Sequence, residues 1–159
     1  MNSCLSTGDQ KPAPAGEIHE KTTLFQNGMG PKKRKVLLID DEAAFSNILK
    51  MTLELDLAYK VCVENDARQA VATARKFWPD IVILDVVMPD LDGGEVQAQF
   101  LADPILKRIP IIFLTAIVQE KEVNEHQGMI GGSLYVAKPV SANRLIELIE
   151  NTLRSRESG

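Results

Sequence analysis

The sequence predicts an α/β domain whose core is a five-stranded parallel sheet, doubly wound, with helices on both faces. The first observation is that five short apolar runs, rich in β-branched residues, alternate with five helical segments. The second is that most of these runs are uninterrupted, which is typical of parallel strands covered on both faces. The crossovers between such strands are expected to be right-handed. A chain of 159 residues is long enough for one such domain and a flanking segment.

The first strand is predicted over 36–39, where four apolar residues follow one another. A helix is predicted over 42–56, because its apolar residues recur at helical spacing. The side chains expected to face the core are Phe45, Ile48, Leu49 and Leu53, with Met51 as a further candidate. The second strand is predicted over 59–64, where apolar residues alternate with others.

Asp66 is placed to cap a helix over 67–77, because its carboxylate can accept hydrogen bonds from free backbone N–H groups. Pro79 ends that helix and precedes the central strand, 81–84. This strand consists of four apolar residues and is followed directly by Asp85. It is therefore the strand that we expect to be most deeply buried.

A turn-rich segment comes next, in which we assign Asp90 and Asp92 to turn formation. A short helix is predicted over 95–102. The remaining elements are expected to be a strand over 109–114, a polar helix over 119–127, a glycine-rich connection over 128–132, a strand over 133–137 and an amphipathic helix capped by Ser141.

Composition divides the chain into a leader over 1–34 that is expected to be disordered and to have a basic end, a folded domain over 35–155 and a tail over 156–159. The basic run Lys32–Lys35 resembles a localisation signal, and it could also contact nucleic acid or anionic lipid. A solvated flank that leads into the first strand is the favoured interpretation.

The charges are distributed unevenly. Residues 1–35 hold six basic and three acidic side chains, whereas the remainder holds 12 basic and 19 acidic ones. This acidic balance argues against a broad nucleic-acid surface on the domain. No apolar run approaches the roughly 20 residues of a membrane span. We therefore expect a cytoplasmic protein without a membrane segment and without a DNA-binding domain.

Polar side chains follow four of the predicted strands at the point where each strand ends. They are Asp40 and Asp41 after the first strand, Asp85 after the third, Thr115 after the fourth and Lys138 after the fifth. Because the carboxyl ends of parallel strands meet at one edge of a sheet, these groups should converge there.

The chemistry of such a cluster can be estimated. Two carboxylates about 4 Å apart repel each other by roughly 4 kcal/mol at an effective dielectric near 20. Three of them either take up protons or bind a cation, and oxygen ligands at an open edge suit Mg²⁺. A carboxylate beside a metal ion and a lysine is a plausible nucleophile toward phosphorus.

These motifs resemble the receiver domain of two-component response regulators. The resemblance lies in the acidic pair Asp40-Asp41, in Asp85 before Met88-Pro89-x-x-Asp92-Gly93, in Thr115-Ala116 and in Lys138-Pro139. Each motif is weak alone, but the ordered set is specific, and it extends over about 35–154. It implies the flavodoxin-like (βα)5 receiver fold.

The resemblance also implies a role for each residue. Asp85 would accept a phosphoryl group from a partner's phosphohistidine, and Lys138 would pair with a phosphoryl oxygen. Asp85 and Asp41 would bind Mg²⁺ directly. Asp40 would bind it through water, and the backbone carbonyl of Val87 would be a further ligand.

The same resemblance implies a switch. Thr115 would hydrogen-bond the phosphoryl group, and its movement would let Tyr135 turn inward. The face formed by the helix over 119–127, the strand over 133–137 and the last helix would then repack, and a homodimer through this face is a further expectation. The implied partners are a histidine kinase or histidine phosphotransfer protein and a downstream protein target.

Other interpretations remain open from the sequence. Taken singly, Asp40 or Asp41 could be a helix cap, Thr115 a strand-end hydroxyl, Lys138 a solvated lysine and Tyr135 a core aromatic residue. The chain could also be a Mg²⁺-dependent phosphatase with an aspartyl nucleophile, or a pseudo-receiver that acts only as an interaction module. The favoured interpretation is a signalling switch that catalyses only its own phosphorylation and dephosphorylation, and so is not a conventional enzyme.

Overall fold

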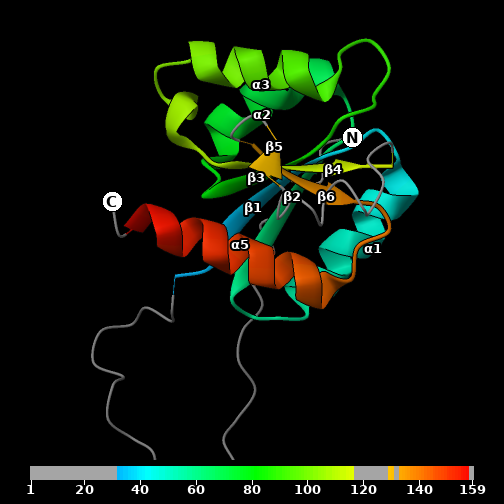
Figure 1. The fold of residues 1–159 in the computed structure, drawn as a ribbon, viewed down its shortest axis with the longest axis vertical. Coiled ribbons are helices and arrows are strands. Elements are labelled where there is room, and N and C mark those ends of the chain that lie inside the picture. The colour runs from blue at the N-terminus through cyan, green and yellow to red at the C-terminus, as the bar shows by residue number, and fades with distance from the viewer. Residues whose placement is uncertain (1–31, 117–128, 131–132, 158–159) are drawn as a thin grey trace, which may run out of the picture.

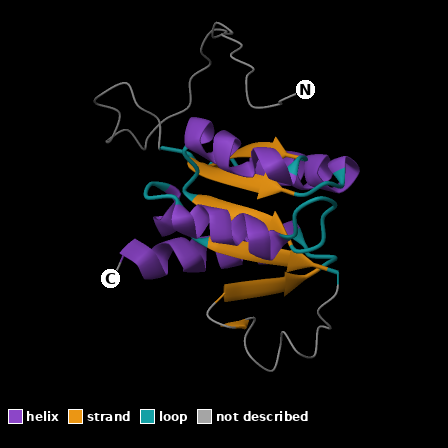
Figure 2. Ribbon diagram, turned by 90° about the horizontal axis from the view of Figure 1, so that it is seen from above, coloured by secondary structure: helices purple, strands orange, loops and turns teal. Residues whose placement is uncertain are grey.

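The computed structural model describes residues 32–116, 129–130 and 133–157 as one sheet covered by helices on both faces. Figure 1 shows α2 and α3 on one side of the sheet and α1 and α5 on the other, and Figure 2 shows the strands layered between them. The strands, in chain order, are β1 (Arg34–Ile39), β2 (Tyr59–Glu64), β3 (Ile81–Asp85), β4 (Ile111–Thr115), β5 (Met129–Ile130) and β6 (Ser133–Ala137).

The sheet order is β2-β1-β3-β4-β6-β5, and every pairing among the five longer strands is parallel. The predicted five-stranded, doubly wound parallel sheet is therefore confirmed. The short strand β5 was not predicted, because its two residues lie in the glycine-rich stretch that we assigned to a connection. It pairs antiparallel with β6, with Met129 opposite Leu134.

The helices follow the predicted order with small differences at their ends. They are α1 (Ala43–Glu54), α2 (Ala70–Phe77), α3 (Gly93–Ala102) and α5 (Ala142–Glu157), with 3₁₀ turns η1 (Ala67–Gln69) and η2 (Leu106–Arg108). The helix predicted over 119–127 and most of the predicted leader lie outside the described residues. None of the helices in the described ranges has the length and apolar content to cross a membrane.

Two residues of the basic run are part of the fold. The ammonium group of Lys35 donates a hydrogen bond to the carbonyl of Phe77 at 2.9 Å, and Arg34 pairs with Glu157 at 3.0 Å. β1 thus begins within the predicted leader, and α5 ends within the predicted tail. The structure places these two residues inside β1 and half-buried, and not in a solvated flank before the strand.

Two apolar clusters form the core, one on each face of the sheet. The first joins Leu49 and Leu53 of α1 to Leu145, Ile149 and Leu153 of α5 over the sheet. The second lies under α2 and α3 and includes the large side chains of the following residues: Phe100, Leu106 and Phe113. The two layers bury the central strand β3 completely on both sides.

The prediction that Ile48 and Met51 face the core is wrong, because their exposed fractions are 66% and 70%. The buried side of α1 instead includes Ser46, whose hydroxyl donates hydrogen bonds to backbone carbonyls of the preceding turn. The buried stripe of α1 thus runs through positions 46, 49 and 53, and Ile48 and Met51 lie outside it.

The turn between β3 and α3 depends on Gly93. A Cβ atom at this position would lie 2.6 Å from the carbonyl oxygen of Asp85 and 3.0 Å from the Cα of Val86. The Gly93 N–H donates to the carbonyl of Val86 at 2.9 Å. Asp92 caps α3 in a reciprocal arrangement with Glu95, which agrees with its assignment to the turn.

We predict that Gly93→Ala lowers the free energy of unfolding by about 1–3 kcal/mol, because the added methyl group contacts backbone that cannot move aside cheaply. Gly94→Ala is the matched control, since a Cβ there meets only the Asp92 side chain, at 3.2 Å. Urea unfolding of both variants measures the difference. Equal stability of the two variants would contradict the close approach.

Candidate functional site

The ends of β1, β3 and β6 bring Asp40, Asp41, Asp85 and Lys138 together at the edge where the parallel strands terminate. One carboxylate oxygen from each of the three aspartates lies within 4.8 Å of the others, and we call these residues the carboxylate cluster. Asp40 and Asp85 are buried, whereas Asp41 is exposed. The sequence predicted this convergence, and the structure places these four residues as expected.

Lys138 is the cation of the cluster. Its ammonium group donates hydrogen bonds to Asp40 Oδ2 at 2.6 Å and to Asp85 Oδ2 at 3.3 Å. The Lys138 N–H also donates to the carbonyl of Thr115 at 2.9 Å, which ties the end of β6 to the end of β4. The side chain of Lys138 is only 14% exposed. This lysine is therefore not the solvated loop residue that the sequence alone left open.

Burial, followed by repulsion from Asp40, raises the pKa of Asp85 above the ordinary value. The positive charge of Lys138 and the N–H of Val87 act against this rise without cancelling it. For Lys138, burial lowers the pKa, but the hydrogen bond and charge of Asp40, with a further contribution from Asp85, outweigh it. The net result is a raised pKa, which keeps this ammonium group charged.

The second oxygen of Asp85 faces the β3–α3 turn, where the N–H of Val87 donates to Oδ1 at 3.3 Å. The side chain of Val87 is 52% exposed and apolar, so the position two residues after Asp85 presents no further carboxylate to the site. Gly93 lies so close to the carbonyl of Asp85 that it leaves no room for a Cβ atom. The position of the Asp85 carboxylate thus depends on the turn as well as on the strand.

Thr115 ends β4 and is fully buried. Tyr135 lies in the neighbouring strand β6, and its ring stacks on that of Phe113 with centroids 4.7 Å apart and an interplanar angle of 14°. The register pairs Tyr135 with Phe113 and Thr115 with Ala137. Thr115 therefore lies at the site. Tyr135 is half-buried and lies two residues further from the carboxyl end of the sheet, beside Phe113.

Sequence reasoning missed Asn65 and Ser46, which support the backbone next to the cluster. The side-chain amide of Asn65 donates to the backbone carbonyl of Asp40 at 2.6 Å and to the hydroxyl of Ser46 at 3.0 Å. The Asp40 carboxylate in turn accepts from the N–H of Glu42 at 2.8 Å. No spacing signals such contacts, because Asn65 follows β2 and reaches Asp40 only in the folded sheet.

The residues of the cluster fit a divalent cation. All the donor atoms are carboxylate oxygens, they lie close together, and a single ammonium group stands against three carboxylates. Oxygen ligands of this kind suit Mg²⁺, which retains several waters and binds one or two carboxylates in sites that also hold phosphate. The chemistry of the donor set thus agrees with the cofactor that the sequence predicted.

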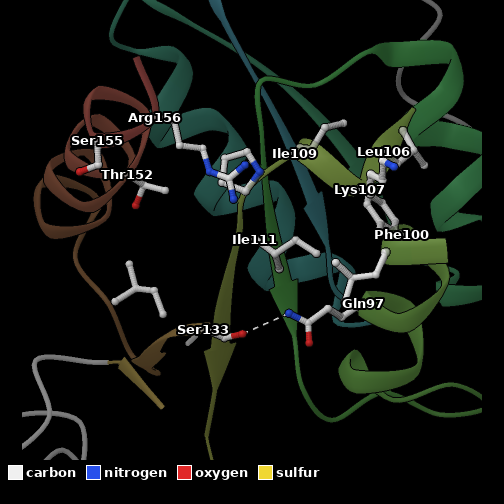
Figure 3. Close-up of a pocket in the computed structure, with 13 residues that line it drawn as sticks. Gln97, Phe100, Leu106, Lys107, Ile109, Ile111, Ser133, Thr152, Ser155 and Arg156 are labelled. Carbon is white, nitrogen blue, oxygen red and sulfur yellow. Dashed lines mark hydrogen bonds between the residues drawn. The ribbon is translucent and has the colours of Figure 1, made fainter. Parts of the chain in front are cut away.

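A cavity of about 440 Å³ lies elsewhere, between α3, β4, β6 and the last turns of α5 (Figure 3). It is lined by apolar residues such as Phe100 and Ile111 and by polar ones such as Thr152, and Gln97 donates a hydrogen bond to Ser133 at 3.1 Å across one wall. None of the predicted site residues lines it. The carboxylate cluster, not this cavity, is the candidate functional site.

Known proteins resemble this chain in sequence. The family model of the response regulator receiver domain matches residues 36–150. The chain is 33% identical over 121 residues to the transcriptional regulatory protein TrcR of Mycobacterium tuberculosis, covering 76% of this chain and 45% of that protein. It is 32% identical over 125 residues to the alkaline phosphatase synthesis transcriptional regulatory protein PhoP of Bacillus subtilis, covering 78% and 50%. The chain spans about half the length of the curated relatives it matches.

Solved structures resemble it as well. The chemotaxis protein CheY4 of Vibrio cholerae matches with a TM-score of 0.63 and 28% identity, over 75% of this chain and 98% of that one. The receiver domain of the Francisella response regulator 1452 matches with a TM-score of 0.64 and 27% identity, over 79% and 99%. In both cases the match covers nearly the whole chain of the solved structure.

The raised pKa of Asp85 predicts a pH dependence of stability. An acid whose pKa is higher in the folded chain binds more protons when folded, so its contribution to stability falls as the pH rises from the ordinary aspartate value through the raised one. Asp85→Asn should therefore raise the free energy of unfolding at pH 7, measured by urea unfolding with a metal chelator present. The gain should disappear below the ordinary aspartate pKa.

The control for this prediction is Asp103→Asn. Hydrogen bonds from the N–H of Ile105, together with those of Arg75 and Leu106, lower the pKa of Asp103, so its contribution is present at neutral pH and lost as the pH falls. This variant should lose stability at pH 7. A loss of stability at pH 7 in Asp85→Asn as well would show that the charge of Asp85 is not unfavourable in the fold.

Proposed function

The chain belongs to the response regulator receiver domain family, and we propose that it is a phosphoacceptor switch of two-component signalling in which Asp85 receives the phosphoryl group. One observation carries the proposal. Asp85 is a buried carboxylate at the end of the central strand, and it lies 3.3 Å from the ammonium group of Lys138 and beside two further aspartates. A carboxylate so placed has the neighbours that phosphoryl transfer requires.

In the proposed reaction, an oxygen of Asp85 attacks the phosphorus of a phosphohistidine on a partner protein. The new P–O bond forms as the P–N bond breaks, and the electron pair of that bond returns to the imidazole nitrogen. Lys138 stays within reach of Asp85 and neutralises charge on the phosphoryl oxygens. Mg²⁺, held by Asp41, Asp85 and the carbonyl of Val87 with Asp40 acting through water, would supply further positive charge at the same oxygens.

The switch that we propose uses two neighbouring strands. The hydroxyl of Thr115 would bond to the phosphoryl group and move toward it, which would vacate space next to β6 for Tyr135. Tyr135 would then leave its stack on Phe113 and change the surface formed by β6 and α5. The third part of that surface, the helix predicted over 119–127, lies outside the described residues.

The partners follow from the same proposal. A histidine kinase or a histidine phosphotransfer protein would supply the phosphoryl group, and a downstream protein or a second copy of this chain would bind the altered face. Two curated relatives are named as transcriptional regulators, and this chain covers half or less of each. The expectation of a chain without a DNA-binding domain therefore stays a prediction, as does the cytoplasmic location.

The alternative functions have less support. A phosphatase with an aspartyl nucleophile needs a second acid two residues after that nucleophile, and this position is Val87. A pseudo-receiver that serves only as an interaction module would have no use for a buried aspartate paired with a largely covered lysine. Keeping such charges buried is costly, so their presence favours the phosphoacceptor.

We predict that incubation with acetyl phosphate and Mg²⁺ adds one phosphoryl group to the wild-type protein and none to Asp85→Asn, as measured by intact mass. Omitting Mg²⁺ should greatly reduce the gain, because the carboxylate cluster then lacks the charge that attracts the phosphoryl donor.

Asp90→Asn is the matched control, since it makes the same chemical change at an exposed aspartate outside the cluster, in the loop after β3. This variant should be phosphorylated as the wild type is. Phosphorylation of Asp85→Asn at the wild-type level would show that another residue is the acceptor. No gain in any variant would leave the pseudo-receiver as the better interpretation.

A further inference from the structure

We propose that Phe45 is a positioning residue for Lys138 and acts through the face of its ring. The ammonium nitrogen of Lys138 lies 4.5 Å from the centroid of the Phe45 ring. This distance is within the range at which a cation is attracted by the negative face of an aromatic ring. Phe45 belongs to the first turn of α1, four residues after Asp41, and is half-buried.

The ring complements the two hydrogen bonds of the lysine. An ammonium group has three N–H donors. One donates to Asp40 at 2.6 Å and one to Asp85 at 3.3 Å. The ring of Phe45 lies on a further side of the ammonium group and attracts its positive charge there. The three contacts come from the residue after β1, from the last residue of β3 and from α1. Together they account for a lysine whose side chain is only 14% exposed although it belongs to a loop.

An aromatic ring differs from a polar neighbour in a way that matters for phosphoryl transfer. A carboxylate or a water molecule on the third side would compete with an incoming phosphoryl oxygen for the ammonium protons. The ring attracts the charge but accepts no proton, so it holds the lysine in place and leaves its N–H groups free to change partners. This part of the inference rests on the proposed function, because it supposes that Lys138 pairs with a phosphoryl oxygen.

A second pair in the same domain provides an internal comparison. The ammonium nitrogen of Lys35 lies 5.4 Å from the ring centroid of Phe77, and this lysine also donates to the carbonyl of Phe77. This pair joins the start of β1 to the end of α2, and neither residue is in the carboxylate cluster. The same substitution made at Phe77 therefore changes a cation–aromatic contact without touching the site.

The test must separate the ring's electrostatic effect from its packing, because Phe45 also contacts the apolar cluster under α1. Phenylalanine carrying one, two or three ring fluorines at position 45 keeps nearly the same shape while the negative potential of the ring face weakens step by step. Two readouts are measured for each protein: solvent exchange of the Lys138 ammonium protons by NMR without phosphodonor, and the rate of phosphorylation by acetyl phosphate with Mg²⁺.

We expect both readouts to change in order with the number of fluorines. The exchange rate should rise, and the phosphorylation rate should fall by roughly threefold to tenfold over the series, as expected for losing one cation–aromatic contact. Phe45→Leu should resemble the trifluorinated protein, whereas Phe45→Trp should retain the wild-type rate. The same series at position 77 should leave both readouts for Lys138 unchanged.

The outcomes separate this inference from the proposed function. If the fluorinated proteins all match the wild type, or if they change equally and without order, the ring acts only by packing and the inference is wrong. If the wild-type protein takes up no phosphoryl group, the proposed function fails, but the ammonium exchange series needs no phosphodonor and still decides whether the ring holds Lys138.

Discussion

The mutual repulsion of three carboxylates at one sheet edge is the constraint on which the site depends. Asp40 and Asp85 are buried at the ends of adjacent strands, where water screens their charges poorly. The ammonium group of Lys138 lies between them and relieves part of the repulsion. Burial, followed by repulsion from Asp40, raises the pKa of Asp85 although Lys138 opposes this rise, and the hydrogen bond and charge of Asp40 raise the pKa of Lys138.

This arrangement requires a rigid framework, which the apolar core provides. β3 lies between β1 and β4 and is buried along its whole length, so the position of Asp85 relative to Asp40 follows from strand register. The approach of Gly93 to the carbonyl of Asp85 then fixes the turn that follows the strand. Packing and charge are thus coupled, because the unfavourable cluster exists only where the sheet holds it.

Features that repeat along the chain could be predicted, whereas those set by three-dimensional contact could not. Apolar runs, one of them alternating with polar residues, identified the five parallel strands, and the positions after the strands identified Asp40, Asp41, Asp85 and Lys138. The core position of Ser46 was missed because a helical repeat records only apolarity, and the exposed Ile48 was assigned wrongly for the same reason.

The contacts around the cluster were hidden in a different way. Asn65 reaches the carbonyl of Asp40 across 25 positions of sequence, and no local pattern distinguishes it from an ordinary loop residue. The apolar character of Phe45 predicted a core position, and the residue does pack against the core, but its ring also lies over the ammonium group of Lys138. A hydrophobic pattern predicts that a side chain contacts the apolar core, but it does not predict that the same side chain also contacts a charged group.

The stack between Tyr135 and Phe113 affects how often Tyr135 changes its position in the unphosphorylated protein. An offset aromatic pair stabilises by about 0.5–1.5 kcal/mol beyond its buried area, which corresponds to a bias of roughly twofold to tenfold. In the proposed switch, a stack of this strength as the main term opposing rotation of Tyr135 would leave an appreciable fraction of unphosphorylated molecules with the altered face. A smaller residue at position 113 would then raise that fraction without any phosphoryl group.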